Sequence, residues 1–527
     1  MVAEVTTFAF EGVDARPVKV QAQVTGGHNG ITIVGLPDKA VSEARERVRA
    51  AFSAVGLGLP PDRITVNLAP ADLPKEGSHF DLPIALAIMM EIGAVSKDLA
   101  EGFAVMGEVG LDGSIMPTMG SLPAAVAANG LDLGFICPAA NGPEAAWAGG
   151  EAEIIAPGSL IQLVNHFKGT QILASPVPGA LSDTPSTPDL RDVKGQESAK
   201  RALEIAAAGG HNLLMSGPPG SGKSMLAARL PGLLPPLSPT EMLEISMIQS
   251  LAGLIEGGKI SRIRPFRAPH HSASMAAMVG GGIRVRPGEA SLAHHGILFL
   301  DELPEFSAPV LDSLRQPLET GDIIIARANA HVRYPARFQL VAAMNPCRCG
   351  YGKASGRACG RGPNCEEVYQ SRVSGPFLDR MDLSIETPPV TAMDLAAPAD
   401  GETTAIVAKR VANARSAQED RAKKLTPDTG NTPQTGFATS PALTNAKLPD
   451  PLLEQVAKPD ADGANLLVRA AETLNLTARA YTRTLRVART LADLDGNDAV
   501  MRRHIAEAIS YRRREEKSAG SEFRVAT

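Results

Sequence analysis

The sequence has few aromatic residues, few cysteines and no long hydrophobic run. Aromatic residues make up 4% of the 527 residues, so we expect no stacking platform for nucleic-acid bases. Five cysteines, four of them between Cys347 and Cys365, do not form the framework of a disulfide-rich secreted protein. No apolar run approaches the roughly 20 residues that span a bilayer. The amino terminus also lacks the basic start and apolar core of a secretory signal. The sequence therefore predicts a cytoplasmic protein with no membrane partner.

A strong excess of charge is also lacking. The formal net charge of -5 gives no overall attraction to a polyanion, so such a partner must be met by local basic patches. Residues 257–288 contain no acidic residue, and the stretch from Arg327 to Arg337 is also free of acid. The basic residues of the first stretch are Lys259, Arg262, Arg264, Arg267, Arg284 and Arg286. Each stretch either contacts a polyanion or is a solvated surface.

The most informative motif is GPPGSGKS at residues 217–224. Glycines in such a loop let backbone amides turn towards phosphate oxygens, while Lys223 reaches the β and γ phosphates and Ser224 offers a hydroxyl to Mg²⁺. An apolar strand before the loop and a helix after it supply the context that phosphate binding needs. We therefore expect ATP to bind at Gly217, Pro218, Pro219, Gly220, Ser221, Gly222, Lys223, Ser224 and Met225.

A second motif completes the expected site. The apolar run at residues 297–300 ends in Asp301 and Glu302. At a strand end, Asp301 would hold Mg²⁺ together with Ser224, and Glu302 would polarise the attacking water. The pair of motifs predicts an enzyme that hydrolyses nucleoside triphosphate.

Composition divides the chain into units. Residues 1–168 alternate short β-like runs (31–34, 64–67, 103–106 and 134–137) with alanine-rich helical stretches, which predicts a separate α/β domain. Residues 169–188 contain a segment rich in proline, serine and threonine that is typical of a linker. The nucleotide motifs lie in residues 189–390. A helical C-terminal domain follows at 391–515, with a flexible loop at about 425–446 and a tail at 516–527.

The central unit resembles the AAA+ superfamily. Asn345 follows the apolar run 340–344 in the position of sensor 1, where its amide would orient the lytic water. Within residues 371–383, Arg380 stands where the family places an arginine finger, and Arg372 is a second candidate. A finger acts on the neighbouring subunit, so the resemblance implies a ring. Arg479 resembles the sensor 2 arginine that reaches the γ phosphate, with Arg483 and Arg486 as competitors.

Residues 265–306 narrow the resemblance to the magnesium-chelatase-like AAA+ proteins of the YifB and ComM family. The resemblance runs from residues 34–52 through 476–494. It implies an α/β fold with a Lon-protease-like N-terminal domain, an AAA+ P-loop core with an insert in helix 2, and a C-terminal helical lid. In related ring motors the insert, which corresponds to residues 280–291 here, and the hairpin at 323–335 face the central pore. The expected DNA contacts are Arg284, Arg286, Arg327 and Arg333.

Histidines and cysteines raise the question of metals. His270, His271, His294 and His295 form two pairs, which we interpret as parts of the family motifs near the nucleotide or the subunit interface. Neighbours on a strand would point to opposite faces, which argues against a metal site. Cys347, Cys349, Cys359 and Cys365 follow sensor 1 in a Gly-rich and Arg-rich loop. They either bind structural Zn²⁺ or are free thiols, because their spacing is not the usual pair of knuckles.

The N-terminal segments 73–87 and 107–128 resemble the proteolytic domain of Lon, which needs a serine activated by a lysine. His79 stands at the serine position and Pro123 at the lysine position. Ser78 and Lys75 are the nearest substitutes. We therefore expect no peptidase activity, and a regulatory or DNA-contacting role instead.

The family resemblance implies a hexameric, ATP-driven DNA helicase that promotes branch migration of incoming strands during natural transformation. Its partners would be single-stranded or branched DNA and recombination proteins. Two other classes stay open. One is a protein-remodelling ATPase without a DNA substrate, and the other is the motor subunit of a metal chelatase.

Overall fold

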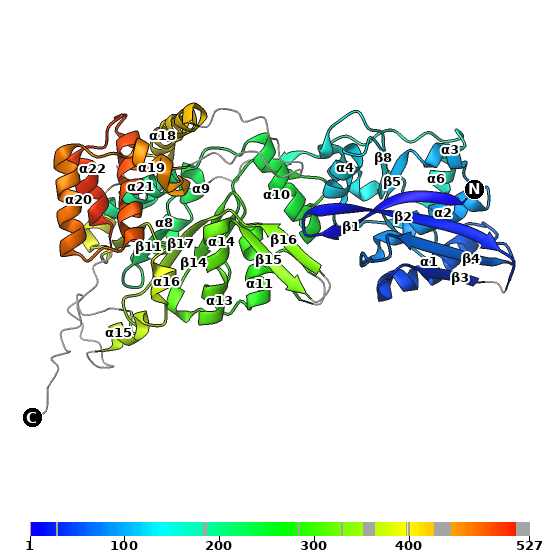
Figure 1. Ribbon diagram of the computed structural model, residues 1–527, viewed down its shortest axis with the longest axis horizontal. Helices are drawn as coiled ribbons and strands as arrows, with labels where there is room; N and C mark the ends of the chain where they lie inside the picture. The colour runs from blue at the N-terminus through cyan, green and yellow to red at the C-terminus, as the bar shows by residue number, and fades with distance from the viewer. Residues whose placement is uncertain are drawn as a thin grey trace, which may run out of the picture.

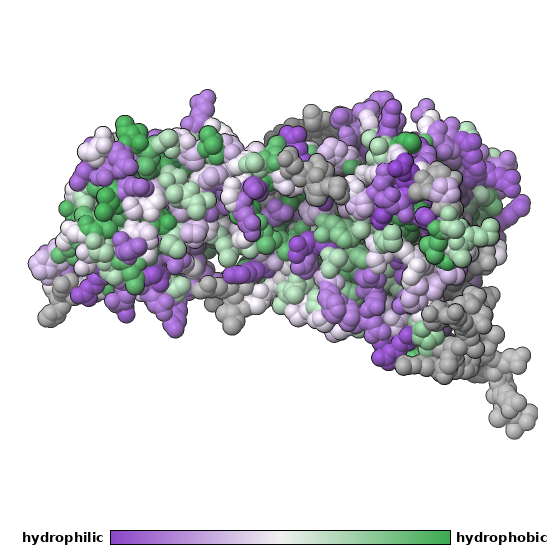
Figure 2. Space-filling view, turned by 180° about the vertical axis from the view of Figure 1, so that it is seen from behind, coloured by the Kyte–Doolittle hydropathy of each residue, from purple (hydrophilic) through white to green (hydrophobic). Residues whose placement is uncertain are grey.

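The computed structural model describes residues 2–27, 30–182, 187–282, 285–327, 330–350, 364–396, 398, 401–425 and 444–512. Figure 1 shows an elongated molecule, with the N-terminal domain at one end, the helical lid at the other and the parallel-sheet domain between them. No helix in these ranges is long and apolar enough to cross a membrane. On the face shown in Figure 2, hydrophilic and hydrophobic residues are interspersed.

The N-terminal domain is built on a mixed sheet in the order β3-β4-β2-β1-β5-β8-β9. Its strands are β1 (Ala3–Glu11), β2 (Asp14–Thr25), β3 (Gly30–Val34), β4 (Arg63–Ala69), β5 (Phe103–Val105), β8 (Gly134–Ile136) and β9 (Ile154–Ile155). A small hairpin is formed by β6 (Glu108–Val109) and β7 (Ile115–Met116). The helices are α1 (Lys39–Ala54), α2 (Asp81–Glu91), α3 (Lys97–Ala100), α4 (Ser121–Asn129), α5 (Gly142–Ala145) and α6 (Leu160–Phe167). The sequence predicted β3, β4, β5 and β8, but not the long hairpin β1–β2 beside them.

Helix α2 is the centre of this domain. Ten of its residues, from Asp81 to Met90, are buried, because it packs on both β1 and β2. The buried Asp81 carboxylate accepts two hydrogen bonds from the Arg47 guanidinium of α1, at 2.6 and 2.9 Å. Burial raises the pKa of Asp81, while this bidentate pair opposes the shift.

The central domain contains a five-stranded sheet in the order β13-β14-β17-β11-β18, with every neighbouring pair parallel. The strands are β11 (Leu213–Ser216), β13 (Phe266–Arg267), β14 (Ile297–Leu300), β17 (Gln339–Met344) and β18 (Leu383–Glu386). The strands β11, β14 and β17 are buried almost throughout, as parallel strands covered on both faces must be. We call the edge where the strands begin the amino edge, and the opposite one the carboxyl edge.

Helices surround this sheet, and a hairpin projects beside it. The helices are α7 (Glu197–Gly209), α8 (Lys223–Ala227), α9 (Leu230–Leu233), α10 (Pro239–Ala252), α11 (Met275–Val279), α12 (Glu289–Leu292), α13 (Ala308–Ser313), α14 (Arg315–Thr320), α15 (Cys365–Gln370) and α16 (Gly375–Leu378). The antiparallel hairpin is β15 (Asp322–Arg327) with β16 (Ala330–Pro335). In Figure 1 this hairpin extends towards the N-terminal domain.

The lid consists of α17 (Ala392–Ala396), α18 (Thr404–Leu425), α19 (Asp450–Val456), α20 (Ala461–Thr473), α21 (Ala478–Leu494) and α22 (Arg502–Ser510). One hydrophobic core continues from α7 and β11 into α18, α21 and α22, so the lid and the sheet domain share buried side chains. The loop predicted at about 425–446 and the predicted tail fall largely outside the described residues.

The two α/β domains contact each other directly. Val13, at the turn between β1 and β2, is buried with Ile248 of α10 and with Val332 and Tyr334 of β16. The Ser250 hydroxyl of α10 donates to the buried Glu144 carboxylate, and its carbonyl accepts from the Gly120 amide at 3.2 Å. Helix α10 therefore bridges the two domains.

The predicted linker is tied to the same region. Its short strand β10 (Leu181–Ser182) pairs in parallel with β12 (Ile260–Ser261). The Trp147 indole donates to the Gly258 carbonyl at 2.8 Å, just before β12. This part of the expected linker thus pairs with the central domain.

Candidate functional site

The phosphate-loop motif joins the carboxyl end of β11 to α8, as the sequence predicted. Gly220 and Gly222 have φ values of +77° and +86°, a region that side chains with a Cβ rarely adopt. Gly217 has no space for a side chain, because a Cβ there would collide with the hydroxyl and carbonyl oxygens of Thr387. The loop is therefore shaped against the residue that follows β18.

Lys223 is turned into this loop. Its ammonium donates to the carbonyl oxygens of Gly217 at 2.7 Å and Pro218 at 2.9 Å, and to Asn345 Oδ1 at 3.3 Å. Burial lowers the pKa of Lys223, and the nearby Asp301 carboxylate opposes that shift. The two carbonyl oxygens accept hydrogen bonds from the ammonium in the place of phosphate oxygens. Asn345, directly after β17, lies beside the lysine, and its role as sensor 1 stays a prediction.

The acidic pair lies at the carboxyl end of β14, on the same edge of the sheet. Asp301 Oδ2 accepts a hydrogen bond from the Ser224 hydroxyl at 2.7 Å. A carboxylate and a hydroxyl on one side of a phosphate loop are oxygen ligands that suit Mg²⁺. Ser224 and Asp301 therefore fit the metal that accompanies ATP.

Glu302 has a left-handed backbone conformation with φ +53°. Its side chain is about half exposed, and one carboxylate oxygen lies 3.5 Å from His271 Nδ1. Such a carboxylate can accept a proton from water. The geometry therefore supplies a base beside the expected positions of phosphate and metal.

Two of the residues at this site were not assigned to it from the sequence. Thr387 donates to the Ser216 carbonyl at 3.2 Å and shares a hydrogen bond with the Ser221 hydroxyl at 2.9 Å. His271 was assigned only to a motif near the nucleotide or an interface, and the structure places it beside Glu302. The available signal for Thr387 was its position directly after a strand of the parallel sheet.

Arg380 lies at the other edge of the sheet. Its carbonyl accepts from Asn212, which precedes β11, and its guanidinium is buried in an ion pair with Glu319. Burial lowers the pKa of Arg380, opposed by Glu319 and assisted by the charges of Arg315, Arg479 and Arg483. Arg380 is therefore remote from the Lys223 of its own chain, as a residue acting on a neighbouring subunit must be.

Arg479, at the start of α21, lies near Arg380 rather than near Lys223. The expectation that it reaches back to the phosphates is therefore not met within one chain. Its two competitors are engaged: Arg483 pairs with Asp382 at 3.0 Å, and Arg486 pairs with Asp450 at 2.9 Å. Arg479 is exposed, which leaves it free for a neighbouring subunit.

Arg372 belongs to a different surface from Arg380. It pairs with Glu305 at 3.2 Å and lies over the Tyr369 ring, 5.9 Å from the ring centre. Glu305 is one turn beyond Glu302, so Arg372 lies on the side of its own acidic pair. Arg380, by contrast, lies at the amino edge of the sheet, buried against Glu319.

The expected DNA contacts are only partly within the described residues. Arg286 is exposed at the base of the insert loop, whereas Arg333 of β16 is exposed but paired with Asp322 at 2.6 Å. Arg284 and the side chain of Arg327 lie outside the described residues. Elsewhere in the basic stretch, Arg264 pairs with Glu241 and Arg267 with Glu289, so these two are structural.

The pair His294 and His295 does not point to opposite faces, because it lies in a turn before β14 rather than on a strand. Both rings reach Glu244 Oε2 of α10, at 3.1 and 2.7 Å. The three groups are close enough to hold a metal ion. However, His294 Nδ1 accepts a hydrogen bond from the Arg337 amide, so its Nε2 carries the proton and donates to Glu244. The hydrogen-bonded arrangement thus argues against a metal.

The cysteine cluster is described only in part. Cys347 is buried, and its sulfur lies 2.6 Å from that of Cys349. Cys365 begins α15, while Cys359 lies outside the described residues. Structural zinc therefore stays a prediction. Cys137, in the N-terminal domain, is fully buried.

The Lon-like segment does not form a serine–lysine dyad. The Ser78 hydroxyl donates to Glu108, and the buried Lys75 ammonium donates to the Pro70 carbonyl. The His79 ring is buried against the Phe8 carbonyl at 2.9 Å, and burial lowers its pKa. Pro123 is buried within α4. These contacts pair Ser78 with a carboxylate rather than with Lys75, and the lack of peptidase activity stays a prediction.

Three family profiles match the chain. "Magnesium chelatase, subunit ChlI" matches residues 189–395, "Subunit ChlI of Mg-chelatase" matches residues 20–141, and "Magnesium chelatase, subunit ChlI C-terminal" matches residues 401–512. The matches fall on the central domain, the N-terminal domain and the lid, respectively.

Similarity to individual proteins extends over almost the full length. The chain is 44% identical to the uncharacterized protein YifB of Salmonella typhimurium over 512 residues, covering 97% of each chain. It is 43% identical to the competence protein ComM of Haemophilus influenzae over 510 residues, covering 96% of each. The magnesium-chelatase 38 kDa subunit of Rhodobacter capsulatus is 26% identical, over 63% of this chain and 91% of its own.

Proposed function

The chain belongs to the YifB and ComM family of magnesium-chelatase-like AAA+ proteins, and we propose that it is a ring-forming ATPase that moves along single-stranded or branched DNA. The biological setting that we propose is recombination of incoming DNA during natural transformation, with recombination proteins as partners. The description of the ComM relative as a competence protein supports that setting.

The observation that carries the ATPase part is the convergence of Lys223, Ser224, Asp301, Glu302 and Asn345 at one edge of the sheet. In this arrangement Lys223 would bind the β and γ phosphates, and Ser224 and Asp301 would hold Mg²⁺. Mg²⁺ neutralises charge that develops on the phosphates. Glu302 and Asn345 would orient the attacking water, and Glu302 would take its proton.

The proposed ring is supported by two arginines that lie away from this edge. Arg380 and Arg479 lie together at the opposite edge and therefore cannot serve the phosphates bound to their own chain. An arginine is worth about 10³ to 10⁵ in rate when it stabilises the transferring phosphoryl group. A neighbouring subunit would supply both residues, and a closed ring supplies them to every site. We propose a homo-hexamer.

The DNA substrate is supported by position and charge. The hairpin β15–β16 extends beside the sheet domain, the insert loop with Arg286 contacts it through the hydrogen bond from Tyr334 to the Val285 carbonyl, and both come from basic stretches of the sequence. Lysine and arginine bind the phosphate backbone without reading its sequence. The ion pair between Arg333 and Asp322 would have to exchange for a pair with phosphate.

One observation favours the first alternative, an ATPase that remodels proteins without a DNA substrate. Arg333 is already neutralised by Asp322, which weakens the hairpin as a phosphate contact. The chelatase-motor alternative is weaker, because the chelatase subunit covers only 63% of this chain.

The test is steady-state ATP hydrolysis with and without single-stranded DNA and four-way-junction DNA. Lys223→Ala provides the blank. We expect stimulation that is strongest on branched DNA and is lost at high salt, because released counterions drive phosphate binding. If ATP turnover is the same with and without each form of DNA, the result would favour the protein-remodelling ATPase instead.

A further inference from the structure

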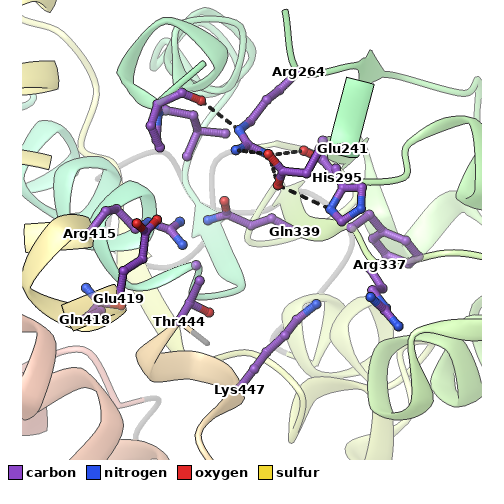
Figure 3. Close-up of a pocket in the computed structure, with 15 residues that line it drawn as sticks. Glu241, Arg264, His295, Arg337, Gln339, Arg415, Gln418, Glu419, Thr444 and Lys447 are labelled. Atoms are coloured by element: carbon purple, nitrogen blue, oxygen red, sulfur yellow. Dashed lines mark hydrogen bonds and ion pairs between the residues drawn. The ribbon is translucent and has the colours of Figure 1, made fainter. Parts of the chain in front are cut away.

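A cavity of about 130 Å³ lies at the amino edge of the central sheet, away from the nucleotide loop at the carboxyl edge. Figure 3 shows its lining. The sheet domain contributes Gly210 before β11, Gly296 before β14 and Arg337 before β17, while the lid contributes Arg415 of α18 and Lys447 before α19. The volume is well above the roughly 15 Å³ that one water molecule needs. The cavity therefore has room for a small hydrated ligand between lid and sheet.

The lining carries more positive than negative charge. Its cations are Arg264, Arg337, Arg415 and Lys447, and its carboxylates are Glu241 and Glu419. Arg264 and Glu241 neutralise each other through two hydrogen bonds at 3.0 and 3.1 Å. His295, also in the lining, contacts Glu241 at 3.5 Å. Three cations then remain against the single carboxylate of Glu419.

These three cations have few partners. The Arg415 guanidinium donates only to the Ala207 carbonyl, at 3.0 and 2.7 Å, among the described residues. Within the same ranges, the side chains of Arg337 and Lys447 have no recorded hydrogen bond or ion pair. In Figure 3 the Lys447 side chain reaches from the lid segment towards Arg337. Like charges thus face each other across the cavity.

Two further observations point to a missing anion. The buried Thr444 hydroxyl, which also lines the cavity, has no hydrogen-bond partner among the described residues. The Lys447 side chain is exposed at one side, and desolvation by the cavity wall together with the charges of Arg337 and Arg415 lowers its pKa to about 8. Burial and Arg264 lower the pKa of Arg415 to about 10. A bound anion would relieve both the repulsion and the unpaired hydroxyl.

We propose that this cavity is a second anion site, separate from the nucleotide loop, which binds one phosphate group through Arg337, Arg415 and Lys447. Guanidinium groups suit phosphate because their donors match two oxygens at once. The phosphate would come from free inorganic phosphate or from a nucleic-acid backbone. Because its ligands belong to lid and sheet, the bound group would fix the two domains to each other. The site does not depend on the proposed DNA motor activity.

The first experiment titrates inorganic phosphate and sulfate into the full-length Lys223→Ala protein, which removes the lysine of the nucleotide loop. Isothermal titration at constant ionic strength, balanced with chloride, measures the affinity. We expect saturable binding that weakens at least about tenfold in Lys447→Met, because a charged donor is lost. The control Lys458→Met removes an exposed lid lysine outside the cavity and should bind as the parent does.

Arg337→Met provides a second variant if Lys447→Met does not fold. Absence of saturable binding in the Lys223→Ala protein would overturn the proposal. Unchanged affinity in the folded cavity variant would overturn it as well.

Sulfate also allows a pH test, because its charge is constant above neutral pH. Because the pKa of Lys447 is lowered to about 8, we expect sulfate affinity to fall by up to about tenfold between pH 7 and pH 9. The other charged and titratable groups that line the cavity are Arg264, Arg337, Arg415, Glu241, Glu419 and His295. In Lys447→Met this dependence should disappear, and its persistence would contradict the assigned role of the lysine.

A single-stranded oligonucleotide distinguishes the two sources of phosphate. If the backbone is the natural ligand, Lys447→Met should weaken oligonucleotide binding and sulfate should compete with it. If free phosphate is the ligand, oligonucleotide affinity should stay unchanged while phosphate binding is lost. Either result supports the cavity as an anion site. If Lys447→Met weakens neither phosphate binding nor oligonucleotide binding, the proposal is rejected.

Discussion

The buried His294 gives the central domain a specific dependence of stability on pH. Its side chain is 1% exposed, and burial lowers its pKa to about 4 although Glu244 favours the charged form. In an unfolded chain the pKa of histidine is about 6.5. The unfolded state therefore binds a proton below pH 6.5, and the folded state does so only near pH 4. Folding stability is lost as the pH falls through this window.

The size of the effect follows from the shift. Lowering the pKa from 6.5 to about 4, at about 1.4 kcal/mol for each unit, gives roughly 3 kcal/mol. In His294→Gln this contribution is absent, so the variant should lose about 3 kcal/mol less stability than the wild type between pH 7 and pH 4. The pKa of Glu244 is lowered to about 2, so its own contribution begins to be lost only below pH 4.5, at the acid end of that window.

The assay is urea unfolding followed by far-UV circular dichroism at pH values from 7 to 4, for the wild type and His294→Gln. His166→Gln, which removes a histidine from the N-terminal domain, is the control. The difference in unfolding free energy between wild type and His294→Gln should shrink steadily as the pH falls. A difference that stays constant over this range would refute the assignment of His294 as a buried neutral histidine.

Four other outcomes are expected. Glu302→Gln should bind ATP but turn it over about 10²-fold or more slowly, because the base is lost, and near-normal turnover would rule out that role. Arg380→Ala should bind nucleotide normally yet lose about 10³-fold in turnover, and mixing it with Glu302→Gln should restore part of the activity if Arg380 acts across a subunit boundary. Metal analysis should find about one zinc per chain, and Cys347→Ser should lose it. If the purified wild-type protein contains no zinc, the cysteines are free thiols instead. Val13→Asp should expose the interdomain segment to faster limited proteolysis, whereas Val34→Asp at an exposed position should not; equal rates would show that the Val13 contact does not hold the domains together.

The strands and loops of the nucleotide site could be predicted because their chemistry is local in sequence. A buried parallel strand followed by glycines or acids is visible in a few residues, and β11, β14 and β17 all lie where such runs predict them. The hairpin β1–β2 was missed, although Val18, Val20 and Ala22 alternate inward on β2. Pro17 hides the strand pattern, because proline is uncommon inside strands. Proline is tolerated here because Pro17 pairs only with Phe8 of β1 and lies before Lys19, where the pairing of β2 with β4 starts.

The rest depends on contacts between distant segments. Glu244 meets two histidines about fifty residues away in the chain, and no local pattern indicates that pairing. Likewise the sequence identified Arg479 but not the edge of the sheet on which it lies, because that edge is set by how α21 packs on α7 and α18. The phosphate cavity is also formed only where lid and sheet domain converge.

The contact at Gly12 has a mechanical consequence. A Cβ at this position would collide with the Arg333 carbonyl of β16, so the turn of the N-terminal domain rests directly on the backbone of the hairpin. Because no space separates the two, a movement of the hairpin towards that turn would also displace the N-terminal domain. The position of the hairpin and that of the N-terminal domain are therefore coupled through this backbone contact.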